Sequence, residues 1–204
     1  MNNNWYSDGQ NRNVPIVTDE QILTACARGD RRAQSRLYQQ CYSFMMSICI
    51  RYTHSRDDAE DLLNRSFLKV LNNLGSKKDN VPFALWVRRI TINTVIDEFR
   101  KNKKKVQFTE INDHDGETEE PDANVVNEYL EQVKVEHLQS LINKLPEASR
   151  KVFNLYAVDG FGHKEIAAML NISEGTSKWH LNAARTRLKE LVFKDLPQIK
   201  SLAS

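Results

Sequence analysis

A set of basic, amide and aromatic side chains near the carboxyl end of the chain is best suited to bind a polar partner. The set consists of Lys178, Trp179, Asn182, Arg185 and Lys189. These positions lie on one side of a helix with 3.6 residues per turn. Their donors can reach phosphates and base edges, so this side fits a DNA major groove. The alternative is an amphipathic helix with a solvated face, but an exposed tryptophan is unusual on such a face.

The flanking residues predict a helix-turn-helix between Gly160 and Leu191. A short first helix would bury the apolar residues Ile166, Ala167 and Leu170. Residues 171–173 then break the helical period, and Ser173 suits the N-cap of a second helix. That second helix would bury the residues at spacings of four, three and four, namely Ser177, Leu181, Ala184 and Leu188.

Four neighbouring carboxylates, Asp57, Asp58, Glu60 and Asp61, could form a metal or acid–base site. They directly follow Ser55, a residue favoured at N-caps, and the helix dipole favours acidic residues in the first turn. Capping therefore accounts for most of them. Since the chain offers no matching base, nucleophile or metal-ligand set, the sequence predicts that the protein is not an enzyme and needs no metal or cofactor.

The three cysteines, Cys26, Cys41 and Cys49, are an odd number and lie on stretches with helical periodicity. We therefore expect reduced thiols in the core of a cytoplasmic protein. Cys49 and His54 do not suggest a zinc site, because the chain has no paired CxxC or HxxxH spacing. No apolar segment approaches the roughly eighteen residues of a membrane span, so we expect neither secretion nor membrane insertion.

Charge is distributed unevenly along the 204 residues, although the net charge is only +2. Residues 77–105 hold nine basic and three acidic residues, whereas residues 106–136 hold ten acidic residues and one lysine. This asymmetry indicates a polyanionic partner and an acidic connector. The length allows one large or two small domains, and the charge pattern favours two.

Capping residues and apolar periodicity predict helices in the amino-terminal half. Thr18 and Gln21 fit a capping box for a first helix that Gly29 ends. Asp30 and Ser55 suit the N-caps of a second and a third helix. Apolar residues recur near every fourth position of the second helix, which we expect to be long and well buried.

A fourth helix is predicted after a loop at residues 75–81, with Pro82 near its first turn. Its apolar stripe includes Trp86, which we expect in the core. The remaining surface carries polar groups able to meet phosphates and bases, namely Arg88, Arg89, Asn93 and Thr94. Residues 100–105 hold five cations in six positions, more than compensation of the helix dipole requires.

Residues 106–123 have no helical period and a high acidic content, so they predict a flexible linker. Helical periodicity returns near Val125, and Pro146 ends one helix and begins the next. That next helix would pack beneath the helix-turn-helix through Val152, Phe153 and Tyr156. It would end at Asp159–Gly160.

The predicted fold class is therefore all-α, with two small helical domains joined by an acidic flexible linker. The expected boundaries are a disordered leader at 1–17, an N-terminal domain at 18–105, the linker at 106–123, a C-terminal helix-turn-helix domain at 124–196 and a tail at 197–204. The sequence shows no strand-period segment of useful length and no internal repeat.

Several motifs, in their order along the chain, resemble the extracytoplasmic-function (ECF) type of bacterial RNA polymerase sigma factor. The amino-terminal motifs are Asp58-Ala59-Glu60-Asp61-Leu62, Phe67-Leu68-Lys69-Val70, and Phe83-Ala84-Leu85-Trp86-Val87-Arg88-Arg89-Ile90 followed by Asn93 and Ile96-Asp97. The carboxyl-terminal motifs are Leu145-Pro146-Glu147, Glu165-Ile166-Ala167 and Gly175-Thr176. The resemblance covers about Ile22 to Leu191, with an acidic gap between the two helical halves.

The resemblance implies a non-enzymatic initiation factor whose partners are core RNA polymerase and promoter DNA. In that family the first domain binds the clamp of the largest polymerase subunit and melts the minus-ten element. The second domain reads the minus-thirty-five element, with the flap of the second-largest subunit as its polymerase partner. An anti-sigma factor is a further candidate partner.

Residue roles follow by position in the family's motifs. The polymerase contact would include Asp61, Leu62, Asn64 and Phe67. DNA near the melted strand would meet the loop and the fourth helix at Lys77, Lys78, Asn80, Arg89, Asn93 and Arg100. Duplex DNA would meet the second domain at Thr176, Lys178, Trp179, Asn182 and Arg185.

Three places depart from the family pattern. Asn64-Arg65 stands where the family usually has Gln-Glu, which reverses a charge at the polymerase contact. Ser177 replaces a common valine, which predicts looser packing of the second helix of the helix-turn-helix. Trp179-His180 replaces a small residue followed by a basic one, so the promoter preference does not transfer.

A stand-alone helix-turn-helix repressor or activator is the alternative function. Such a protein would use its amino-terminal half for ligand sensing or dimerisation and would act without polymerase. It should bind its operator tightly by itself, at about 10⁻⁸ M or better. A sigma factor, by contrast, should need core polymerase.

Overall fold

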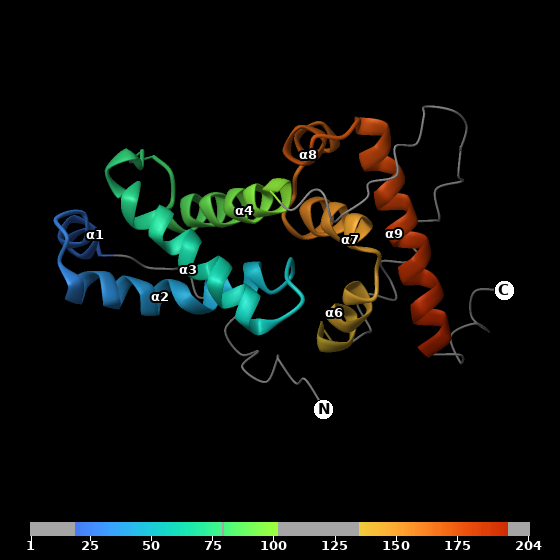
Figure 1. Ribbon diagram of the computed structural model, residues 1–204, viewed down its shortest axis with the longest axis horizontal. Coiled ribbons are helices and arrows are strands. Elements are labelled where there is room, and N and C mark those ends of the chain that lie inside the picture. Colours follow the sequence, from blue (N-terminus) through green and yellow to red (C-terminus); the bar gives the residue numbers. More distant parts are fainter. Residues whose placement is uncertain (1–18, 79, 102–134, 196–204) are drawn as a thin grey trace. The chain divides into compact units, whose positions relative to one another are not determined.

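The chain folds into two compact helical units, unit 1 within residues 1–101 and unit 2 within 102–204 (Figure 1). The computed structural model describes residues 19–78, 80–101 and 135–195, and no strand occurs in those ranges. The all-α prediction is therefore confirmed. The predicted leader, linker and tail, together with the expected helix start near Val125, lie outside the described residues.

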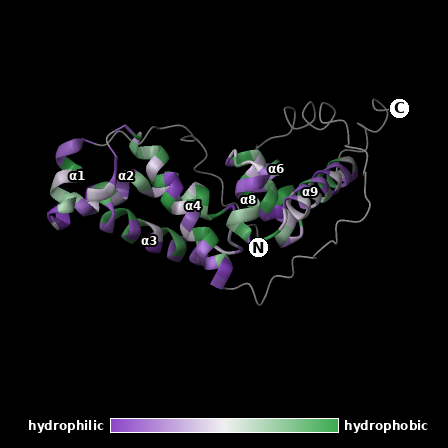
Figure 2. Cartoon of the chain, turned by 90° about the horizontal axis from the view of Figure 1, so that it is seen from above, coloured by the Kyte–Doolittle hydropathy of each residue, from purple (hydrophilic) through white to green (hydrophobic). Residues whose placement is uncertain are grey.

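Unit 1 is organised around α2. Its described elements are α1 (Glu20–Ala27), α2 (Arg31–Cys49), α3 (Arg56–Asn72), the 3₁₀ turn η1 (Leu74–Ser76) and α4 (Phe83–Lys101). Helix α2 packs on α1, α3 and α4, and α3 also packs on α4. Hydrophobic and hydrophilic residues alternate around these helices (Figure 2), as expected when each helix buries one face.

Side-chain caps begin the first three helices of unit 1. Asp30 accepts hydrogen bonds from two backbone N–H groups in the first turn of α2, at 2.8 and 3.0 Å. Ser55 Oγ accepts one from the N–H of Asp58 at 3.0 Å. Both residues were predicted as caps. Helix α1 is capped by Asp19, one residue after the predicted Thr18, which lies outside the described residues.

The core of unit 1 is apolar and includes the cysteines. Its fully buried side chains include Leu37, Cys41, Met45, Leu63, Val70 and Val87. Burial raises the pKa of Cys41 and Cys49 to about 12, so both thiols stay neutral and act as packing groups. Trp86, predicted in the core, is only half-buried, because Phe83 and Val87 take the inward positions of this turn.

Unit 2 is organised around its last helix. The described elements are α6 (Val135–Asn143), α7 (Glu147–Phe153), the π-helical turn η3 (Asn154–Val158), α8 (His163–Leu170) and α9 (Glu174–Asp195). Helix α9 packs on α6, α7 and α8. Pro146 precedes α7, as predicted. Gly160 follows η3 with φ of 78°, a conformation that glycine adopts without steric cost.

Helices α8 and α9 form the predicted helix-turn-helix. The predicted inward residues Ile166, Leu170, Ser177, Leu181, Ala184 and Leu188 are all buried. Asn171 ends α8 in the left-handed region, with φ of 54° and ψ of 57°, which asparagine tolerates better than most residues. Ser173 Oγ accepts a hydrogen bond from the N–H of Thr176 at 2.9 Å and so caps α9.

Two buried polar residues of α9 have hydrogen-bond partners on other helices. Ser177 Oγ lies 2.9 Å from Nδ1 of His163 on α8. His180 Nδ1 lies 3.0 Å from Ser149 Oγ on α7. Ser177 is fully buried and the imidazole of His163 satisfies its hydroxyl, whereas the looser packing expected of this helix stays a prediction.

We expect unit 2 to lose stability as the pH falls below 6.5. Burial lowers the pKa of His180 to about 4, from an ordinary value of 6.5. Between these values the unfolded chain binds a proton that the folded chain does not, so the free energy of unfolding falls by at most roughly 3 kcal/mol. Urea denaturation followed by circular dichroism at several pH values would measure this loss.

The variant His180→Gln is the matched control for this measurement. Glutamine retains a polar side chain for the Ser149 hydroxyl but does not titrate. The free energy of unfolding of this variant should therefore change less between pH 6.5 and 4 than that of the wild-type chain. The same pH dependence in both proteins would contradict the assignment to His180.

Candidate nucleic-acid interface

The outward face of α9 carries most of the side chains predicted to meet duplex DNA. Lys178 is exposed, Trp179 is 40% exposed, and Asn182 and Arg185 are half-buried. Thr176 differs, because its side chain is buried and its hydroxyl lies 2.9 Å from that of Ser173. Thr176 therefore supports the start of α9 through its side chain.

Sequence reasoning missed a ring stack beside this face. Tyr156, predicted to pack beneath the helix-turn-helix, is 36% exposed. Its ring is stacked on that of His163, with centroids 4.7 Å apart and an interplanar angle of 22°. The guanidinium carbon of Arg185 lies 5.9 Å from the Tyr156 ring centroid. The π-helical turn rotates Tyr156 away from the face that buries Val152 and Phe153.

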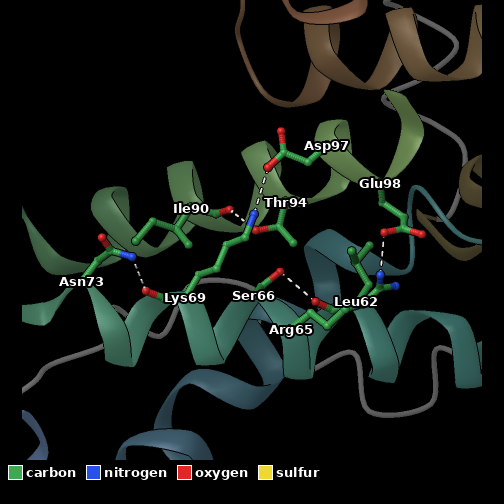
Figure 3. Close-up of polar contacts among 9 residues, drawn as sticks. All are labelled: Leu62, Arg65, Ser66, Lys69, Asn73, Ile90, Thr94, Asp97 and Glu98. Atoms are coloured by element: carbon green, nitrogen blue, oxygen red, sulfur yellow. Dashed lines mark hydrogen bonds and ion pairs between the residues drawn. The ribbon is translucent and has the colours of Figure 1, made fainter. Parts of the chain in front are cut away.

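The exposed surface of α4 carries a second group of candidate DNA contacts. Arg89, Asn93 and Arg100 are exposed. Thr94 is not, because its side chain is buried and its Oγ1 donates a hydrogen bond to the carbonyl of Ile90 at 2.8 Å (Figure 3). The prediction that Thr94 lies on the surface is therefore wrong.

The loop before α4 is held partly by one of its own lysines. Lys77 Nζ donates hydrogen bonds to the carbonyls of Lys78 and Val81, both at 3.1 Å. Its side chain therefore folds back over the loop, although it was predicted to meet DNA. The other two predicted contacts of this loop, Lys78 and Asn80, are exposed.

Two of the predicted polymerase contacts on α3 are exposed and two are buried. Asp61 and Asn64 are exposed, whereas Leu62 and Phe67 are buried. The Phe67 ring packs edge-on against Tyr38 of α2, with centroids 5.1 Å apart. Leu62 and Phe67 thus pack within unit 1 instead of presenting a contact surface. Leu68, which was not among the predicted contacts, is 58% exposed.

Two ion pairs connect α3 to α4 beside these residues (Figure 3). Arg65 lies 2.5 Å from Glu98 and also 3.0 Å from Asp61. Lys69 pairs with Asp97 at 2.9 Å. The positive charge at Arg65, which departs from the family pattern, is therefore balanced inside unit 1.

The neighbouring carboxylates of α3 have structural partners. Asp58 accepts a hydrogen bond from Ser55 Oγ at 2.6 Å. Glu60 accepts hydrogen bonds from Arg56 at 2.9 Å and from Tyr42 at 3.2 Å, and these bonds lower the pKa of its carboxyl. Capping accounts for the first turn, whereas side-chain pairing accounts for Glu60 and Asp61.

Among the described residues, no group of three or more histidine, cysteine or acidic side chains could hold a metal ion. Within the same ranges, no helix has the length and apolar character to cross a membrane.

Comparisons with known proteins match both units in the order of the chain. Residues 37–105 match sigma-70 region 2, and residues 136–188 match sigma-70 region 4. RNA polymerase sigma factor YlaC of Bacillus subtilis is 31% identical over 159 residues, which cover 78% of this chain and 91% of that protein. The chain belongs to the ECF group of the sigma-70 family. It therefore acts with RNA polymerase in promoter-directed transcription initiation.

More distant relatives span both units of the sigma factor as well. The ECF RNA polymerase sigma-E factor of Escherichia coli K12 is 24% identical over 186 residues, which cover 86% of this chain and 95% of that protein. A solved structure of the sigma factor RpoE with the anti-sigma factor NepR, from Bartonella quintana, matches with 21% identity and a TM-score of 0.46. It covers 78% of this chain and 95% of that one.

Two adjacent residues of α3 should differ in how much their truncation lowers the free energy of unfolding. Phe67→Ala removes a buried ring and should lower the free energy of unfolding of the sigma factor by about 3–5 kcal/mol. Leu68→Ala changes an exposed side chain and should alter it by no more than about 0.5 kcal/mol. Urea denaturation of the two variants compares them directly. Equal stabilities of the two variants would contradict the difference in burial between Phe67 and Leu68.

Proposed function

We propose that this sigma factor uses three surfaces, each built on one helix or on a helix and its preceding loop. The clamp surface comprises Asp61, Asn64 and Leu68 on α3. The strand surface comprises Lys78, Asn80, Arg89, Asn93 and Arg100. The duplex surface comprises Lys178, Trp179, Asn182 and Arg185 on α9. The observation that carries the proposal is the outward direction of the α9 donors.

The duplex surface suits the upstream promoter element. The buried row on the opposite side of α9 fixes which residues point outward. Lysine and arginine can bind phosphates or guanine edges, and Asn182 can pair with an adenine edge. Trp179 lies edge-on to His180, with ring centroids 4.9 Å apart, so a ring on this surface is held by a buried neighbour.

The strand surface suits the opened element. Asn93 is an exposed amide between two exposed arginines of α4, and an amide can read base edges that a lysine cannot distinguish. The hydrogen bonds of Lys77 hold the loop carbonyls, which leaves Lys78 and Asn80 facing outward. Unstacking the bases during melting costs a few kcal/mol per base step. Stacking of these bases on the protein and contacts with their phosphates offset this cost.

The clamp surface combines one large apolar residue with two polar ones. Leu68 supplies exposed apolar area, and interfaces concentrate their binding energy in a few such anchors. The amide oxygen of Asn64 accepts a hydrogen bond from the Tyr38 hydroxyl at 2.8 Å, so its orientation is fixed before binding. Asp61 is exposed and paired with Arg65.

We expect Leu68→Glu to weaken binding to core RNA polymerase by roughly tenfold or more, because it places a charge at the apolar anchor. Pull-down of purified core polymerase by the full-length chain measures this effect. Leu85→Glu is the control. Leu85 of α4 is 56% exposed, close to the 58% of Leu68, but lies outside the clamp surface.

Circular dichroism should show wild-type helix content in both leucine variants, because both side chains are largely exposed. If Leu68→Glu keeps its helix content and binds core polymerase as well as Leu85→Glu, α3 does not present the clamp surface.

Asn93→Ala should impair promoter opening more than promoter docking, by about fivefold or more, because a base-edge contact is lost. The test uses holoenzyme assembled from core polymerase and the full chain. A promoter fragment enriched from genomic DNA by wild-type holoenzyme is the probe, and permanganate reactivity of its thymines reports opening. Gln39→Ala on α2, an exposed amide outside the strand surface, is the control. Normal thymine reactivity in Asn93→Ala would remove Asn93 from the strand surface.

The proposal needs no catalytic group or cofactor in the chain, because recognition and strand selection are binding events. Core polymerase would be contacted at the clamp of its largest subunit and at the flap of its second-largest subunit. An anti-sigma factor stays a candidate partner on the family resemblance alone. No described contact favours the alternative of a stand-alone regulator.

A further inference from the structure

Three side chains from three elements of unit 2 contact one another in series, and we call this group the Tyr156 stack. Tyr156 comes from η3, His163 from α8 and Arg185 from α9. Both of the other side chains contact Tyr156: His163 is stacked on its ring with centroids 4.7 Å apart, and the Arg185 guanidinium carbon lies 5.9 Å from its centroid. The stack therefore connects the first helix of the helix-turn-helix to the outward face of the second.

The backbone before α8 places the tyrosine in this position. The π-helical turn at Asn154–Val158 interrupts the α-helical register of α7. It closes with a hydrogen bond from the N–H of Asp159 to the carbonyl of Asn154 at 2.9 Å, and the N–H of Phe161 then bonds to the carbonyl of Leu155 at 3.0 Å. Such single π turns are frequent at functional sites.

The other end of the stack is anchored in the interior. His163 Nδ1 lies 2.9 Å from the hydroxyl of Ser177, which is fully buried. Ser177 and Arg185 belong to the same helix, two turns apart. The contacts therefore run from α9 through α8 and η3 and back to α9, which restricts the motion of both rings.

The charges around the stack favour a neutral imidazole at pH 7. Burial lowers the pKa of His163, and the positive charges of Lys178 and Arg185 lower it further, whereas Glu174 opposes them. A neutral ring does not repel the Arg185 guanidinium. The Tyr156 ring can then attract that cation.

We propose that Tyr156 is a positioning residue that fixes the guanidinium of Arg185 for contact with promoter duplex, and that His163 and Ser177 hold Tyr156 in place. An unrestrained arginine loses much rotamer freedom on binding, and a side chain held in its bound direction loses less. This inference rests on the proposed duplex surface. It makes that surface depend on two residues outside α9, namely Tyr156 of η3 and His163 of α8.

A double-mutant cycle on DNA binding tests the inference. Holoenzyme is assembled with wild-type chain, Tyr156→Leu, Arg185→Ala or both, and the probe is the genomic promoter fragment enriched by wild-type holoenzyme. Arg185→Ala should weaken binding by about 5- to 150-fold. Tyr156→Leu should weaken it by about 2- to 5-fold, the effect of an exposed cation–π contact. In the Arg185→Ala background, Tyr156→Leu should have no effect.

Two further variants separate positioning from a general structural role. Tyr156→Phe keeps the ring and should bind like the wild-type chain. Val158→Ala changes another exposed apolar residue of the same π-helical turn, and it should also leave binding unchanged. If Tyr156→Leu loses helix content by circular dichroism, Tyr156→Met takes its place in the cycle.

A measurement without DNA tests the contact itself. In proton NMR spectra of the full chain, the Arg185 δ-protons should be shifted upfield by the Tyr156 ring. The shift should persist in Tyr156→Phe and disappear in Tyr156→Leu. Wild-type δ-protons at their ordinary position would overturn the stack.

The two hypotheses fail in different ways. If Arg185→Ala leaves DNA binding unchanged while the NMR shift is present, the proposed duplex surface is wrong and the positioning role falls with it. If Arg185→Ala weakens binding and Tyr156→Leu weakens it equally in both backgrounds, the duplex surface stands and the positioning role is overturned. If Tyr156→Leu has no effect in the Arg185→Ala background and Tyr156→Phe binds like the wild-type chain, the positioning role is supported.

Discussion

Burial of one row of α9 is the constraint on which the DNA-binding unit depends. Ser177, Leu181, Ala184 and Leu188 are almost completely buried, and α9 packs on α6, α7 and α8. Because side chains are fixed around a helix at about 100° per residue, burying this row leaves Lys178 and Arg185 away from the core. The donors need no contacts of their own to point outward.

The helices of unit 1 are held together by apolar packing and not by the polar contacts between or within them. The buried hydroxyls of Ser66, Thr91 and Thr94 donate to carbonyls four residues earlier in their own helices, so they add no bond between helices. The Arg65–Glu98 and Lys69–Asp97 pairs cross between α3 and α4 but are partly exposed. Such pairs contribute about 0–1 kcal/mol. Apolar packing therefore holds α3 on α4, and the pairs mainly set the surface charge.

Local chemistry made much of the fold predictable from sequence, and longer-range contacts limited the prediction of the site. Asp30, Ser55 and Ser173 could be recognised as caps because a cap depends on the next three residues. Tyr156 could not be placed, because the π-helical turn that rotates it has no clear sequence signal. Leu62 and Phe67 were predicted as polymerase contacts from their positions in the family's motif. Position in a motif does not tell whether the buried Phe67 or the exposed Leu68 presents the contact. Lys77 folds back on carbonyls that only the loop geometry brings near.

Two residues that depart from the family pattern have ion-pair or hydrogen-bond partners within the chain. Arg65 lies against Glu98 and Asp61, so the charge reversal on α3 is balanced at its own helix and its neighbour. Ser177 places a hydroxyl in the interior, where an unpaired one would cost about 1–3 kcal/mol, and His163 satisfies it. Once His163 is held there, its ring becomes the base on which Tyr156 stacks. A polar substitution in the core thus has a consequence on the surface, because the same imidazole connects the buried serine to the tyrosine beside Arg185.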